Sequence, residues 1–141
     1  MNFEEYRKYD ALGLAALVKS KEVQASELLD LAIQRTEAVN PKINAVVSKL
    51  YDLAKEQIKT LDANATFAGV PFLLKDLDAH LAGTRCTGGS GILKNYVSKE
   101  TSETVHRAIK SGLIIFGKSN TPEFGVTPFT EGKLLGTAYN P

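Results

Sequence analysis

Apolar residues recur at helical spacing in three stretches of the first half of the chain. Asp10 and Ser26 precede the first two stretches and carry side-chain oxygens of the kind that cap helix N-termini. Asn40-Pro41 is expected to end the second helix, because a proline disfavours helical backbone in the residue before it. The pattern therefore predicts helices over residues 10–19, 26–40 and 51–61, with a short extended piece over residues 44–47.

The segment from Gly69 to Leu77 shows the two-residue alternation of a β-strand, and it contains a lysine at an unusual place. Apolar residues lie on both of its faces, which is typical of a strand covered on both sides. A lysine amine that is removed from water favours its neutral form and can act as a general base. Two ordinary alternatives stay open for Lys75: a lysine that protects an edge strand, or one whose amine extends to water. Val70, Phe72 and Leu74 form one face of this strand, and Leu73, Lys75 and Leu77 form the other.

The second half of the chain begins with an irregular, glycine-rich stretch over residues 78–100. A helix follows, capped at Thr101 or Ser102 and ended by Gly112 in the position after its C-cap. The apolar run over residues 113–116 predicts a second strand that is buried on both faces. A strand, a loop with a helix, and a strand make a right-handed crossover, so we expect two parallel strands and an α/β protein.

Composition is that of an ordinary globular domain and excludes some classes of partner. The 141 residues carry a net charge of +1, so nothing indicates nucleic acid or an anionic membrane as a partner. No apolar run approaches the roughly 20 residues that span a bilayer. Cys86 is the single cysteine, which excludes an internal disulfide and fits a cytoplasmic location.

Three separate segments then resemble, in order, motifs of the amidase signature family of serine-dependent amide hydrolases. The resemblance implies an α/β fold in which helices cover a mixed sheet, with residues 1–141 as the N-terminal portion of a single amidase domain. The family continues after Asn-Pro with a Gly/Ser-rich segment that is absent here, so the sheet is expected to be incomplete. The three segments are Gly69-Val70-Pro71-Phe72-Leu73-Leu74-Lys75-Asp76, Gly117-Lys118-Ser119-Asn120-Thr121-Pro122-Glu123-Phe124-Gly125 and Gly136-Thr137-Ala138-Tyr139-Asn140-Pro141.

The resemblance also implies a chemistry and a catalytic residue. Lys75 matches the family's catalytic lysine, which acts through a bridging serine on a nucleophilic serine; both serines belong to the absent segment. Such enzymes hydrolyse carboxamide C–N bonds through an acyl-enzyme, without a metal or an organic cofactor. The sequence Thr-Pro-Glu-Phe-Gly at residues 121–125 resembles general amidases, including those that act on cyclic or linear aminohexanoate amides.

Taken alone, the chain is expected to be inactive. Two alternatives remain: half of a split hydrolase that a complementary C-terminal chain completes, or a non-catalytic remnant or binding module. An unfinished sheet also predicts an unpaired edge, and hence self-association.

Two other residues are candidate nucleophiles. Ser90 lies in Thr87-Gly88-Gly89-Ser90-Gly91, which resembles a nucleophile elbow superficially but lacks the strand before it and the helix after it. We therefore interpret Ser90 as a turn residue. No catalytic motif surrounds Cys86, so we expect a small buried apolar side chain there.

The remaining polar candidates have structural interpretations. His80 and His106 have no ligand at zinc-site spacing, and His106 lies among charged helix residues. Alternation directs Asp76 to the face opposite Lys75, so direct pairing of the two is not expected. Glu123 follows a proline that can begin a short helical turn, where its carboxylate would accept the turn's free N–H groups. The resemblance alone makes the loop from Gly125 to Gly136 a candidate wall of the substrate cleft.

Overall fold

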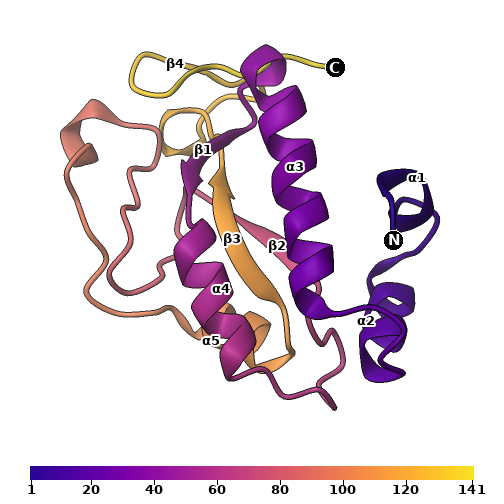
Figure 1. The fold of residues 1–141 in the computed structure, drawn as a ribbon. Coiled ribbons are helices and arrows are strands. Elements are labelled where there is room, and N and C mark those ends of the chain that lie inside the picture. Colours follow the sequence, from indigo (N-terminus) through magenta and orange to yellow (C-terminus); the bar gives the residue numbers. More distant parts are fainter. The chain divides into compact units, whose positions relative to one another are not determined.

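The computed structural model describes residues 1–141 and has both helices and strands, as the sequence predicts for an α/β protein (Figure 1). None of the helices has the length and apolar character needed to cross a membrane. In chain order the elements are α1 (Phe3–Tyr6), α2 (Ala11–Lys19), α3 (Ala25–Ile43), β1 (Val46–Lys49), α4 (Tyr51–Lys59), β2 (Pro71–Lys75), the 3-10 helix η1 (Gly91–Leu93), α5 (Glu103–Lys110), β3 (Ile114–Ser119), the 3-10 helix η2 (Glu123–Gly125), β4 (Glu131–Gly132) and β5 (Gly136–Thr137).

The main sheet has three strands in the order β1-β3-β2. β1 pairs antiparallel with β3, for example Ser48 opposite Lys118. Along β2 and β3 the hydrogen bonds join residues that rise together in number, from Ile114 N–H to the Val70 carbonyl at 2.8 Å to Asp76 N–H to the Ser119 carbonyl at 3.0 Å. These two strands are therefore parallel, as predicted from the crossover, and the sheet is mixed.

The central position of β3 explains its sequence. Its first five residues are all buried, whereas β2, at the edge of the sheet, buries only Leu74. The predicted apolar strand is thus confirmed and extends further than expected, from Ile114 to Ser119, because residues beyond the apolar run continue the pairing with β1. A continuous apolar run fits a strand whose two faces are both covered.

Two helix predictions are confirmed at their ends. Asp10 caps α2, and its carboxylate accepts the N–H of Gly13 at 2.7 Å. Gly112 follows α5 with a φ of +95°, a left-handed conformation that favours glycine. An alanine there would bring its Cβ within 2.8 Å of Ala65 and Ala68.

The predicted ends of the second helix are wrong. α3 begins at Ala25, so Ser26 lies inside its first turn, and the Glu27 carboxylate accepts the N–H of Gln24 instead. Pro41 lies inside the helix, close to its C-terminal end, rather than after it. The helix ends with Asn44 in a left-handed conformation at a φ of +48°, so an asparagine rather than the proline marks the stop.

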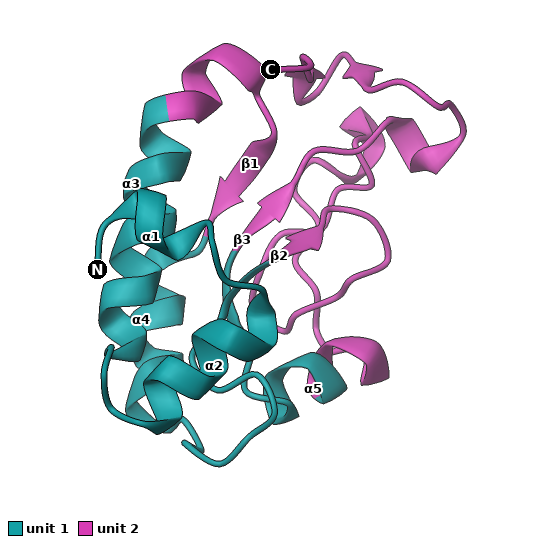
Figure 2. Ribbon diagram, turned by 90° about the vertical axis from the view of Figure 1, so that its right-hand side faces the viewer, with its two compact units in different colours: residues 1–38, 50–72, 107–116 teal, residues 39–49, 73–106, 117–141 magenta.

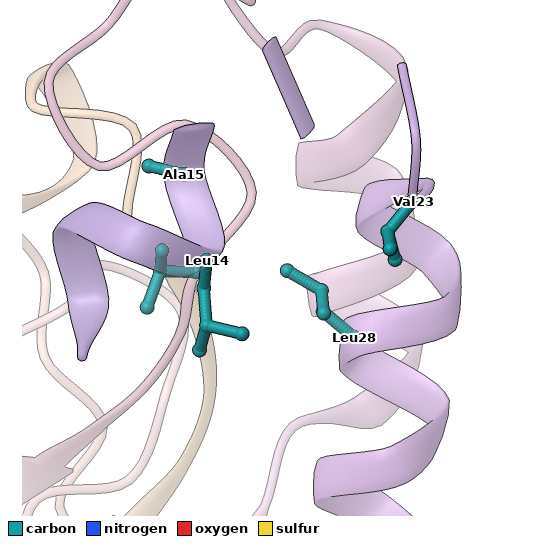
Figure 3. Packing of buried hydrophobic residues seen from close by; sticks show 5 residues of the cluster. Leu14, Ala15, Val23 and Leu28 are labelled. Carbon is teal, nitrogen blue, oxygen red and sulfur yellow. The ribbon is translucent and has the colours of Figure 1, made fainter. Parts of the chain in front are cut away.

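The chain divides into two compact units, drawn in teal and magenta in Figure 2. Unit 1 has an apolar core between α2 and α3, and Figure 3 shows Leu14 and Leu28 pointing toward one another from these helices. Gly69 lies beside this core: an added Cβ would come within 2.7 Å of that of Ala25, so a larger residue there would push into α3. Unit 1 comprises Met1–Ala38, Leu50–Phe72 and Arg107–Phe116.

Unit 2 contains the glycine-rich stretch and the C-terminal residues. The extended loop predicted after residue 117 is only partly irregular, because β4 and β5 pair as a short antiparallel hairpin. The side-chain amide of Asn44 donates to the carbonyls of Leu135 and Thr137, at 2.8 and 3.1 Å, and so attaches this hairpin to the end of α3. Unit 2 comprises Val39–Lys49, Leu73–His106 and Gly117–Pro141.

Candidate active site

Lys75, the residue that sequence analysis selects, is the last residue of β2 and is exposed. The expectation that both faces of its strand are covered is wrong for these 141 residues. Leu73 and Leu77, which share the face of Lys75 by alternation, are only half-buried. β2 also lies at the edge of the sheet, with a neighbouring strand on one side only. The chain thus presents the Lys75 amine to solvent, as in the edge-strand alternative.

Asp76 immediately follows Lys75 and is buried, with 2% of its surface exposed. Its carboxylate accepts the backbone N–H of Thr87 at 3.1 Å and the hydroxyl of the same threonine. Thr87 itself is fully buried. Asp76 therefore joins the end of β2 to the glycine-rich stretch. Its carboxylate does not bind Lys75, as alternation predicts.

The buried lysine of the structure is Lys118 on β3, which is 0% exposed. Its ammonium donates a 2.7 Å hydrogen bond to the carbonyl oxygen of Arg85. Burial lowers the pKa of Lys118 below 10.5, while the nearby Cys86 and Asp76 act in the opposite direction because negative charge favours the ammonium. Lys118 is therefore the lysine that the fold buries, and the sequence analysis did not select it.

One signal in the sequence could have indicated Lys118. It comes two residues after the apolar run Ile114-Ile115-Phe116, and a single glycine inside a strand pattern does not have to end the strand. Lys118 can therefore continue a strand predicted to be buried on both faces. The charged residue on the central strand, rather than the one on the edge strand, is the one that the fold removes from water.

Cys86 lies beside this lysine and is buried and unpaired. Burial raises the pKa of its thiol above 9.0, the neighbouring Lys118 lowers it, and the carboxylates of Asp76 and Asp78 raise it again. A thiol that is held protonated is a poor nucleophile. The interpretation of Cys86 as a small buried side chain therefore agrees with its surroundings.

Ser90 is fully buried and has the role of a turn residue. Its hydroxyl accepts the N–H of Ile92 at 3.3 Å and donates to the Glu123 carboxylate at 2.6 Å. The expectation for Glu123 is thus correct in kind, since the carboxylate has a structural contact. Its partner, however, is a serine 33 positions earlier in the chain rather than the N–H groups of its own turn.

Neither histidine takes part in the contacts described above. His80 Nδ1 is 3.0 Å from the hydroxyl of Ser98, and its ring meets that of Tyr96 edge to face. His106 is exposed on α5. No group of three or more His, Cys, Asp or Glu side chains is arranged to hold a metal ion.

Comparison with known proteins places this arrangement in a family. The model of the Amidase family matches residues 27–141, so the chain belongs to the amidase family. A lipoamidase from Enterococcus faecalis is 38% identical over 138 residues, which cover 97% of this chain and 19% of the lipoamidase. The 6-aminohexanoate-cyclic-dimer hydrolase of Pseudomonas sp. (strain NK87) is 38% identical over 134 residues, covering 94% of this chain and 27% of the hydrolase.

Solved structures agree with this assignment. The structure of 6-aminohexanoate cyclic dimer hydrolase complexed with substrate matches with a TM-score of 0.89 and 36% identity, over 94% of this chain and 27% of the hydrolase. A bacterial aryl acylamidase of the amidase signature family matches with a TM-score of 0.87 and 30% identity, over 94% of this chain and 29% of that enzyme. The chain thus spans less than a third of the length of these relatives, which hydrolyse amide bonds, and corresponds to their N-terminal part.

Proposed function

We propose that this chain contributes the general base, Lys75, to an amide hydrolase whose two serines lie on polypeptide outside residues 1–141. The observation that carries the proposal is the position of Lys75. Its amine is reachable at the end of a strand, within the family match that covers residues 27–141. An exposed amine on this surface is available to a hydroxyl that another segment brings to it.

The proposed reaction uses one proton relay in both directions. The neutral amine of Lys75 takes a proton from the bridging serine, which takes one from the nucleophilic serine, and that oxygen attacks the amide carbonyl. The C–N bond breaks as the relay returns the proton to the leaving amine, and water then hydrolyses the acyl-enzyme. Backbone N–H groups of the additional segment would stabilise the oxyanion.

The additional polypeptide has a second task in this proposal. In water an amine near neutral pH is largely protonated, and a protonated amine cannot accept a proton. A segment that covers the face of Lys75 would exclude water and favour the neutral form. The exposure of Lys75 is consequently a reason to expect no hydrolysis by the chain alone.

The proposed substrate is a small carboxamide of the linear or cyclic aminohexanoate type. The similarity to 6-aminohexanoate-cyclic-dimer hydrolase supports it, at 38% identity. The serines would come from a continuation of the domain or from a complementary second chain. The open edge of β2 fits either source, and it also fits self-association when no cover is present. A cytoplasmic location is part of the proposal, supported by the single, unpaired cysteine.

Complementation tests the function. The chain is mixed with a fragment of 6-aminohexanoate-cyclic-dimer hydrolase that lacks its matching N-terminal part, and release of linear product from the cyclic dimer is measured. We expect turnover only in the mixture, loss of it in Lys75→Ala, and retention of it in Lys94→Ala, which changes another exposed lysine. Turnover that survives Lys75→Ala, or labelling of the isolated chain by a serine-reactive phosphonate, would contradict the proposal.

A further inference from the structure

Two buried charged side chains hold one short segment at two points. The Lys118 ammonium binds the Arg85 carbonyl at 2.7 Å, and the Asp76 carboxylate binds the backbone N–H and hydroxyl of Thr87, two residues further on. The two charged groups also act on each other, since Asp76 favours the charged form of Lys118. Residues 85–87 are therefore attached to β3 through Lys118 and to the end of β2 through Asp76.

The same two residues lie beside a main-chain bond between these strands. The N–H of Asp76 donates to the carbonyl of Ser119 at 3.0 Å, so the residue after Lys75 is bonded to the residue after Lys118. Lys75 is thus one residue away from a backbone hydrogen bond and a buried side-chain network. Neither of the charged residues is itself exposed, at 2% for Asp76 and 0% for Lys118.

Buried charged side chains are in general not needed to stabilise a fold. Apolar residues of similar volume often replace a buried charged pair without loss of stability. Buried polar networks instead rigidify the segments they join when all their members have partners. Every buried side-chain nitrogen and oxygen in this structure has a partner, so the network meets that condition.

We propose that Asp76 and Lys118 are positioning residues for Lys75. They attach residues 85–87 to the end of β2 and to β3, and alternation leaves the Lys75 side chain on the face opposite Asp76, free to meet a hydroxyl. The inference deepens the proposed function and rests on it for the role of Lys75. Small displacements of a catalytic group reduce the rate strongly, so a base on an edge strand benefits from a fixed backbone.

Hydrogen exchange in the isolated chain tests the network without any catalysis. The variants are Asp76→Asn and Lys118→Met, with Lys94→Met as the same substitution at an exposed lysine. In the first two variants we expect the backbone amide at position 76 to exchange its hydrogen roughly tenfold faster. The Ile114 amide, at the other end of the β2–β3 pair, should keep its exchange rate. Unchanged exchange at Asp76 overturns the inference, as does equal acceleration at both amides, which would indicate general loosening.

Activity supplies the second measurement. In the complementation mixture we expect kcat to fall about tenfold in both variants while KM stays constant, because substrate contacts are retained and the base is misplaced. Lys118→Arg, which keeps a buried donor, is expected to restore part of kcat. An unchanged kcat, or a rise in KM alone, overturns the inference. If the unaltered mixture hydrolyses nothing, the proposed function fails, and the exchange result still decides the positioning network.

Discussion

The hydroxyl of Ser90 donates a 2.6 Å hydrogen bond to the carboxylate of Glu123 and so joins η1 to η2. Ser90→Ala removes this bond and the one that the serine accepts from Ile92. Because Glu123 and Ile92 are exposed and can bind water instead, we expect a loss of about 1 kcal/mol in the free energy of unfolding. Urea unfolding checks this. Ser20→Ala, at an exposed serine, should cost about half as much or less; equal losses would show that the Ser90 contact adds nothing.

The two lysines of the site should differ in how strongly the same substitution lowers stability. Lys118→Met leaves the Arg85 carbonyl without its donor, and relief of the buried ammonium offsets part of this, so we expect destabilisation of about 1–3 kcal/mol. Lys75→Met changes an exposed side chain and should stay within about 0.5 kcal/mol. Chemical denaturation of both variants provides the comparison, and equal effects would contradict the difference in burial.

A comparison of alanine substitutions at Gly112 and Gly83 distinguishes the cost of backbone strain from the cost of steric overlap. Both have a positive φ, +95° and +76°, so an alanine at either costs about 1–2 kcal/mol of strain. At Gly112 the added Cβ would also lie 2.8 Å from Ala65 and Ala68, whereas at Gly83 nothing lies within 4 Å. We expect Gly112→Ala to lower the free energy of unfolding by about 3 kcal/mol or more, and Gly83→Ala by about half of that. Thermal unfolding of the two variants in one buffer tests which of them loses more stability. A smaller loss for Gly112→Ala than for Gly83→Ala would contradict the prediction.

Tyr51 is expected to make the protein less stable as the pH rises into the alkaline range. Burial, the hydrogen bond to Glu37 and the charge of that carboxylate raise the pKa of the Tyr51 hydroxyl above its ordinary 10.0. Above pH 10 the unfolded chain therefore loses this proton while the folded chain keeps it, so the free energy of unfolding falls as pH rises. Between pH 10 and 11 the loss should be about 0.5–1 kcal/mol, after allowance for solvent at the partly exposed ring.

Tyr51→Phe removes this proton from both states and should remove that part of the decline. Urea unfolding of both proteins at the two pH values measures it. The pKa of Tyr6 is also raised by burial, but it contributes equally to both proteins and cancels in their difference. Parallel pH curves for the two proteins would contradict a raised pKa at Tyr51.

Local signals in the sequence predicted much of the fold. Asp10 and Gly112 marked helix ends correctly because capping depends on the residue itself and its immediate backbone. Pro41 misled because a local side-chain contact holds the end of α3: the Asn40 side chain binds both the N–H and the carbonyl of Val46, at 2.7 and 2.8 Å. A bond that spans a turn can outweigh the preference of a single proline.

The site was less accessible to the same reasoning. Alternation around Lys75 describes which residues share a face, but whether that face is covered depends on the position of the strand in the sheet. β2 lies at the edge and β3 in the centre, so burial fell on Lys118 instead. The partners of Asp76 could not be found either, since Thr87 comes from a glycine-rich stretch without periodicity.

The attachment of the C-terminal hairpin has a consequence for synthesis of the protein. The side-chain amide of Asn44 binds carbonyls that lie 91 and 93 positions later in the chain. Contacts between such distant residues form slowly and late. On the ribosome this asparagine emerges long before its acceptors, and until they follow, water occupies its two donors.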